Sequence, residues 1–136
     1  MTEEYLKPVP SPTRDSQPYW TGLMDERLLI QQCGRCGKRR HYPRPLCDVC
    51  YSFDVNWVEA SGKGTVHSWT VTHHPFNLGF KRELPYALVT VDLAEGVRMQ
   101  AQLRDLPHER IAIGMPVALR FERAKEDLVL PYFVPA

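Results

Sequence analysis

The residues with the clearest chemical potential are four cysteines that lie close together in the chain. They form two Cys-x-x-Cys pairs, Cys33 with Cys36 and Cys47 with Cys50, separated by ten residues. Two intervening residues allow a tight turn to aim both thiolates of a pair at one point, so two pairs complete a tetrahedral sulfur cage. The spacing therefore predicts a zinc site. Because four thiolates leave no position for an activated water, we expect a structural metal.

Three other interpretations of these cysteines are weaker. Two disulfides would require an oxidising compartment, and a redox dithiol would need one pair rather than two. An iron site would use the same thiolates. His41 lies between the pairs and could replace one ligand, but with four thiolates present we expect it on the surface or behind the ligands.

The loop between the pairs is strongly basic. Its charged residues, with those of the adjoining turns, are Arg35, Lys38, Arg39, Arg40, Arg44 and Asp48. Zinc with four thiolates carries about two negative charges, which balance part of this positive charge. The remainder predicts either a solvated face or a patch for an anionic group, such as a nucleotide phosphate or an acidic partner surface.

Composition limits the class of protein. A chain of 136 residues forms one compact unit or two very small ones, and 43% apolar with 24% charged residues is typical of a folded globular protein. Twelve prolines spread along the chain argue against a helical bundle. The net charge of +1 lacks the basic excess of a dedicated nucleic-acid module. No apolar run follows the charged first residues, so we expect a cytoplasmic protein without a membrane span.

The pattern along the chain predicts three segments. Residues 1–17 contain several prolines and no periodicity, which predicts an extended arm. Residues 18–60 hold a short helix, a strand at 28–32 and the zinc ribbon. Tyr19 and Trp20 of that helix either cover the ribbon and barrel or anchor a partner chain at an interface. Residues 61–136 alternate apolar and polar side chains and predict a barrel.

The predicted fold class is mainly β, with a five-stranded OB-fold barrel after the ribbon. Alternation predicts strands near residues 62–72, 85–93, 97–103, 117–121 and 128–132. The long segment 73–84 between the first two strands contains two aromatic residues and two adjacent cations. Because binding residues favour long loops, we expect this segment to face a ligand or partner.

No independent active site is evident. The chain contains no phosphate-binding Gly-rich loop, no Gly-x-Ser-x-Gly elbow and no His-Glu-x-x-His pair. Ser61 and Ser68 have no evident base in the local pattern, and all the cysteines are assigned to zinc. His73 and His74 are adjacent and would point to opposite faces of a strand. We therefore expect no catalytic residues in this chain.

Several motifs in the chain together resemble one family. They are Cys-Gly-x-Cys-Gly, Pro-Arg-Pro-Leu-Cys-x-x-Cys, Ser-Gly-Lys-Gly-Thr-Val-His-Ser-Trp-Thr-Val at 61–71, Pro-Tyr-Ala at 85–87 and Gly-Met-Pro-Val at 114–117. In this order and spacing they resemble the acyl-CoA-associated proteins that join a rubredoxin-like zinc ribbon to an OB fold. The resemblance runs from about Pro18 to the C-terminus.

The resemblance implies an accessory subunit in a hetero-oligomer with a thiolase-like enzyme, either a thiolase or a CoA-thioester aldolase or synthase. The partner would supply the nucleophile, while this chain would assist assembly and acyl-CoA binding. Carried over to this chain, Cys33, Cys36, Cys47 and Cys50 would be ligands of a structural zinc. The family fixes no CoA-binding residue here.

Candidate contacts for CoA follow from its chemistry, because cationic side chains bind its phosphates and aromatic rings stack on its adenine. The candidates are Lys38, Arg39, Arg40, Phe76, Phe80, Lys81 and Arg82. The alternative function is a ribbon and OB module for single-stranded nucleic acid, which would need a basic groove with stacking aromatics. A free-standing enzyme is a third hypothesis and would have to turn over an acyl-CoA alone.

Overall fold

A single short α-helix opens the folded part of the described chain. The computed structural model describes residues 5–136, so the first four residues of the predicted arm lie outside it. α1 spans Gln17–Met24, with a proline in its first turn, where the missing N–H costs no helical hydrogen bond. Its apolar side is buried, with Leu23 fully inaccessible. Within residues 5–136 no helix has the length and apolar content needed to cross a bilayer.

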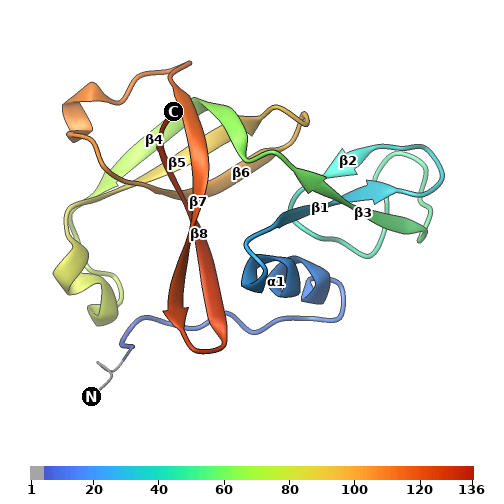
Figure 1. The fold of residues 1–136 in the computed structure, drawn as a ribbon, viewed down its shortest axis with the longest axis horizontal. Coiled ribbons are helices and arrows are strands. Elements are labelled where there is room, and N and C mark those ends of the chain that lie inside the picture. The colour runs from blue at the N-terminus through green and yellow to red at the C-terminus, as the bar shows by residue number, and fades with distance from the viewer. Residues whose placement is uncertain (1–4) are drawn as a thin grey trace.

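The ribbon is a three-stranded antiparallel sheet with strand order β2-β1-β3. Its strands are β1 Leu28–Cys33, β2 Arg39–Arg40 and β3 Val55–Ala60. β1 runs directly into the first cysteine pair, and β3 returns from the second. Both knuckles therefore lie at the end of the ribbon that is remote from the barrel (Figure 1).

The rest of the chain forms a closed five-stranded barrel with strand order β4-β5-β6-β8-β7. Its strands are β4 Lys63–Thr72, β5 Tyr86–Leu93, β6 Arg98–Leu103, β7 Pro116–Lys125 and β8 Leu128–Pro135. The pair β6 and β8 is parallel, and the other pairs are antiparallel. Two 3-10 turns, η1 Leu78–Glu83 and η2 His108–Arg110, lie in the connections. The predicted mainly β class with an OB-type barrel is confirmed.

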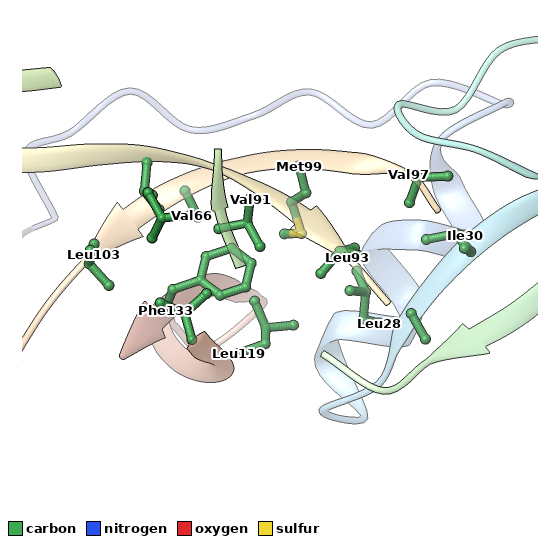
Figure 2. Close-up of a cluster of buried hydrophobic side chains, with 14 of the residues drawn as sticks. Leu28, Ile30, Val66, Val91, Leu93, Val97, Met99, Leu103, Leu119 and Phe133 are labelled. Carbon is green, nitrogen blue, oxygen red and sulfur yellow. The ribbon is translucent and has the colours of Figure 1, made fainter. Parts of the chain in front are cut away.

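The barrel core continues under the ribbon. Phe133 is fully buried at the centre of the barrel, as expected for the inward positions of alternating strands. Figure 2 shows Leu28 and Ile30 of β1 beside Leu93 and Val97 at the end of the hairpin that joins β5 and β6. Because one cluster of buried side chains spans both parts, the ribbon and the barrel pack as one unit.

β4 bends near its start. Its register against β5 shifts between Val66 and Ser68, a bulge that increases local twist. Gly64 allows β4 to approach β5 closely, because a Cβ at this position would lie 2.5 Å from Cγ1 of Val91. The bend lets β4 pair with β5 along most of its length and with β7 at its start, which closes the barrel.

The described part of the arm crosses the outside of the barrel before it reaches α1 (Figure 1). Lys7 forms an ion pair of 3.0 Å with Glu83. The backbone at Leu6 lies against Gly79, where any Cβ would collide with the Leu6 carbonyl oxygen. From residue 5 onward the arm thus contacts its own barrel.

Candidate metal centre

The two cysteine pairs converge on one point at the tip of the ribbon. The four Sγ atoms all lie within 4.8 Å of one another. Cys33 Sγ lies 3.5 Å from Cys50 Sγ, and Cys36 Sγ lies 3.6 Å from Cys47 Sγ. Zinc to sulfur bonds of about 2.3 Å in a tetrahedron would place the sulfurs about 3.8 Å apart. The donor set and its spacing fit a four-coordinate zinc ion.

Backbone turns hold the first knuckle in place. Gly37 donates its N–H to the Cys33 carbonyl at 3.0 Å and has φ of +79°, a conformation that favours glycine. Gly34 serves the knuckle in another way, by allowing a close approach of two segments. A Cβ there would lie 3.0 Å from Cβ of Asp54, so it allows the segment after the second knuckle to approach.

Backbone N–H groups and neighbouring thiols set the acidity of the cysteines. The N–H groups of Cys36 and Arg35 point at Cys33 Sγ and lower the pKa of that thiol to about 6. Backbone N–H groups of Cys50 and Val49 likewise lower the pKa of Cys47. At Cys36 the Lys38 N–H acts in the same direction, but burial and the adjacent thiols prevail and raise its pKa to about 11. Thiolates sharing one cage resist simultaneous ionisation unless a cation lies between them.

Part of the basic loop is used internally. Lys38 pairs with Asp48 at 2.7 Å on the outside of the ribbon. Arg40 is buried at 6% exposure, where its Nε donates to Gln31 Oε1 at 2.7 Å and an Nη donates to the Arg44 carbonyl at 3.0 Å. The Arg40 guanidinium therefore organises the loop between the knuckles, and little of it is accessible for the predicted contact with CoA.

His41 lies away from the sulfur cluster, in the junction between the ribbon and α1. Its ring centroid is 5.3 Å from that of Tyr19 and 4.1 Å from that of Tyr42. Both ring nitrogens are buried and have no hydrogen-bond partner among the described residues. Burial therefore lowers the pKa of His41 to about 4 and favours the neutral ring.

The two aromatic residues of α1 differ in accessibility. Tyr19 is only 5% exposed, and its burial raises its pKa well above the usual range. Of the two roles predicted for Tyr19, its position fits the first, since it belongs to the core that joins α1 to the ribbon and barrel. Trp20 is half-buried against the same core, with its ring edge-on to Tyr19 at 5.0 Å.

The predicted CoA-contacting residues do not form one site. Lys38 and Arg39 lie on the ribbon, whereas Phe76, Phe80, Lys81 and Arg82 lie in and before η1. β2 and the yellow-green η1 segment stand at opposite ends of the molecule (Figure 1). Within the η1 group Phe76 is 90% exposed, while Phe80 is half-buried and packs 5.5 Å from Tyr86.

A cavity of about 560 Å³ lies where the arm, α1, the ribbon and the barrel meet. Aromatic, proline and glutamine side chains dominate its lining, which includes Tyr5, Trp20, Tyr42, Phe80, Gln100 and Pro131. Sequence reasoning missed this cavity. Its walls come from segments far apart in the chain, so no local spacing signals it.

These features define a class of protein: a tetrathiolate zinc ribbon followed by an OB-fold barrel. The rubredoxin-like zinc ribbon domain of ChsH2 matches residues 20–56, and the C-terminal OB-fold domain of ChsH2 matches residues 57–122. The chain belongs to the DUF35 family of zinc-ribbon and OB-fold proteins.

Relatives of this chain occur in different lengths. It is 36% identical over 110 residues to a DUF35 domain-containing scaffold protein of Pyrococcus furiosus, covering 79% of each chain. It is 42% identical over 131 residues to a probable enoyl-CoA hydratase alpha subunit of Thermomonospora curvata, covering 96% of this chain and 40% of that protein. The chain thus spans less than half of that hydratase subunit.

A solved structure matches nearly the whole fold. The matched chain comes from a structure described as the Ltp2-ChsH2(DUF35) aldolase, with a TM-score of 0.86 and 41% identity. The match covers 93% of this chain and 98% of that chain. A DUF35 protein of Sulfolobus solfataricus, at 14% identity and a TM-score of 0.62, shares the fold alone.

Proposed function

We propose that this chain is a non-catalytic accessory subunit of an acyl-CoA enzyme complex. One observation carries the proposal: along nearly its full length the chain matches, at 41% identity, a chain of a solved aldolase assembly. The DUF35 proteins described as scaffolds support the same role, since the present chain covers most of their length.

The metal would have a structural role in this subunit. Cys33, Cys36, Cys47 and Cys50 would hold zinc in a closed tetrahedral shell, with no position left for a reacting group. The bound ion would join the first knuckle to the second and so supply the cohesion that the short ribbon strands lack. With the thiols used in this way, the chain offers no cysteine nucleophile.

The partner would be a thiolase-superfamily enzyme, and the two chains would form a hetero-oligomer. The motifs that relate this chain to acyl-CoA-associated proteins support that class. The relatives of the chain include both a probable hydratase subunit and a chain of an aldolase assembly. The chemistry would reside on the partner, and the reaction would act on a CoA thioester.

A contact with CoA itself fits the η1 segment better than the ribbon. Phe76 is 90% exposed, and Lys81 is exposed five residues later. An exposed ring with a neighbouring ammonium group suits an adenine and a phosphate. We propose this segment, with Phe80 and Arg82, as the part of the chain nearest the CoA portion of the substrate.

A single-stranded nucleic-acid module has less support. The exposed cation on strand β6, Arg98, pairs with Asp92 at 2.6 Å, so the outer face of the barrel loses positive charge there. The same carboxylate lies 3.4 Å from His67. Binding of nucleic acid would need an unneutralised basic track.

Affinity purification from native cells tests the proposal. The full-length chain is tagged and recovered at low salt, and the recovered species are identified by mass spectrometry and separated by size. We expect a stoichiometric enzyme of the thiolase superfamily. Recovery of the chain alone, or with nucleic acid, would contradict the proposed function.

A further inference from the structure

The second cysteine knuckle presents apolar side chains to solvent. Tyr51 is 71% exposed, Phe53 is 75% exposed and Val55 is 37% exposed. Single exposed apolar residues are ordinary on a protein surface, but several within five positions on one rigid turn form a patch. Such aromatic residues are enriched at the centres of protein interfaces.

Two of these side chains form one wall of a groove. The groove has a volume of about 510 Å³ and lies between the second knuckle, the loop after β2 and the start of α1. We call it the knuckle groove. Its lining consists of Arg14, Asp15, Pro18, Gln31, Arg44, Pro45, Phe53, Val55 and Trp57.

The charge around the knuckle groove is unbalanced. Arg14 and Arg44 are both exposed, and neither forms an ion pair with a carboxylate of residues 5–136. Asp15 is the single acidic residue of the lining. The groove has a mixed polar and apolar lining, and its two guanidinium groups lie beyond ion-pair distance of the described carboxylates, although Arg44 is near enough to Asp48 to lower the pKa of that carboxyl. Such a groove is complementary to a surface that combines apolar side chains with carboxylates.

The metal centre fixes the shape of this wall. Cys47 accepts the Tyr51 N–H at 3.0 Å and donates its own N–H to the Ser52 carbonyl at 3.0 Å. The Asp54 carbonyl accepts from Gly34 of the first knuckle at 2.9 Å. Since the turn on either side of Phe53 is tied to the cysteine pairs, its backbone is fixed before any partner binds, which lowers the entropic cost of ordering this wall on binding.

We propose that the knuckle groove is the docking site for the acyl-CoA enzyme subunit, which inserts an apolar cluster flanked by carboxylates. This inference rests on the proposed function and adds the surface through which the partner is held. A second copy of this chain is a poorer occupant, because a two-fold contact would place Arg44 and Arg14 against the same cations. Nucleic acid would use the guanidinium groups and Phe53 but would gain little from Val55 and the prolines.

Binding of purified partner tests the docking site. The enzyme subunit recovered with the wild-type chain is separated, and its Kd for each variant is measured at low and high salt. Phe53→Ser should weaken binding at least about 30-fold, as expected for a central aromatic contact. Arg44→Glu should weaken it at least about 10-fold, and the wild-type Kd should rise with salt.

Two matched substitutions on the barrel serve as controls. Ile113 is 76% exposed, close to the exposure of Phe53, and Arg110 is an exposed arginine that forms no ion pair with a carboxylate of residues 5–136. Ile113→Ser and Arg110→Glu should leave the Kd within about twofold of wild type. Each variant is first checked for wild-type zinc content and circular dichroism, so a folding defect is recognised.

The outcomes separate the two proposals. An enzyme subunit that binds Phe53→Ser and Arg44→Glu as tightly as wild type would overturn the docking site and leave the proposed function standing. Loss of a self-dimer, or of single-stranded DNA binding, in these variants without loss of enzyme binding would also overturn it. If the wild-type chain recovers no acyl-CoA enzyme, the proposed function fails and the docking site fails with it.

Discussion

The hydroxyl of Tyr42 forms a two-way bridge to the backbone of Gln100. It accepts the Gln100 N–H at 3.0 Å and donates to the Gln100 carbonyl at 3.4 Å. Tyr42 belongs to the loop between the cysteine pairs, and Gln100 lies in strand β6 of the barrel. The bridge links the metal-bearing ribbon to the barrel beyond their shared apolar core, and thereby orients the knuckles relative to the barrel.

Removing this hydroxyl should loosen the ribbon without unfolding it. Tyr42→Phe should lower the free energy of unfolding by only about 1 kcal/mol. The site is partly exposed, so water can hydrogen-bond to the Gln100 backbone N–H and carbonyl in place of the hydroxyl. Amide hydrogen exchange at Gln100 should accelerate. Tyr51→Phe is the matched control, since Tyr51 is 71% exposed and should show neither effect. Unchanged exchange at Gln100 in Tyr42→Phe would contradict the role of the bridge.

The buried side chain of Gln31 holds the loop between the cysteine pairs through two hydrogen bonds. Its side-chain oxygen accepts both from Arg40 Nε at 2.7 Å and from the Arg44 backbone N–H at 2.8 Å. Gln31→Ala would leave a buried guanidinium without this acceptor and should cost about 3 kcal/mol of unfolding free energy. Gln32→Ala, one position along, should cost less than about 1 kcal/mol. Chemical denaturation of both variants measures these losses. Equal losses of unfolding free energy in Gln31→Ala and Gln32→Ala would contradict the role assigned to Gln31.

Loss of one thiolate should release the metal and the ribbon together. In Cys47→Ser three ligands remain, so we expect zinc content to fall well below one per chain and the thermal midpoint to drop by more than 10 °C. Val49→Ser, in the same knuckle at a site 60% exposed, should keep both properties. Metal analysis and calorimetry test this, and a fully loaded Cys47→Ser chain with an unchanged midpoint would rule out the ligand assignment.

The buried His41 ring should make stability depend on pH. Its pKa is about 4 in the folded chain against 6.5 for an unperturbed histidine, so the unfolded chain binds more protons between these limits. The stabilising effect of the neutral ring is complete above pH 6.5 and declines as the pH falls toward 4. From pH 7 to pH 5 this amounts to about 2 kcal/mol.

His41→Phe keeps a ring between Tyr19 and Tyr42 but cannot take up a proton. Urea unfolding of the wild type and of His41→Phe at pH 7 and pH 5 should therefore give a smaller loss of stability in the variant. Protonation of the thiolates affects both chains alike and cancels in the comparison. Equal losses on acidification would show that His41 is not a source of the pH dependence.

Features that depend on residues close together in the sequence could be predicted from the sequence. Alternation along β5 and β6 predicted the hairpin, because inward side chains such as Val89 and Val91 must recur every second residue. The cysteine spacing predicted the sulfur cluster, because two residues set each knuckle. β3 was missed, although it pairs with β1 along its full length, since its first residues, Val55 and Asn56, are exposed.

Other features depend on contacts between distant parts of the chain. Arg40 resembles its exposed neighbours in sequence, and only the acceptor on Gln31 explains its burial. Tyr19 likewise resembles a surface anchor until α1 is packed on β1 and the barrel. Neither position carries a local signal, because the partner atoms come from other elements of the fold.

The measurement that tests the central claim most directly is reconstitution of the separated complex. The co-purified enzyme subunit and this chain are assayed apart and together with the CoA thioester that the intact complex consumes. We expect no turnover by this chain alone, and restoration of the partner's full rate when the zinc-loaded chain is added. Turnover by this chain alone, or a partner rate that does not change on its addition, would contradict the accessory role.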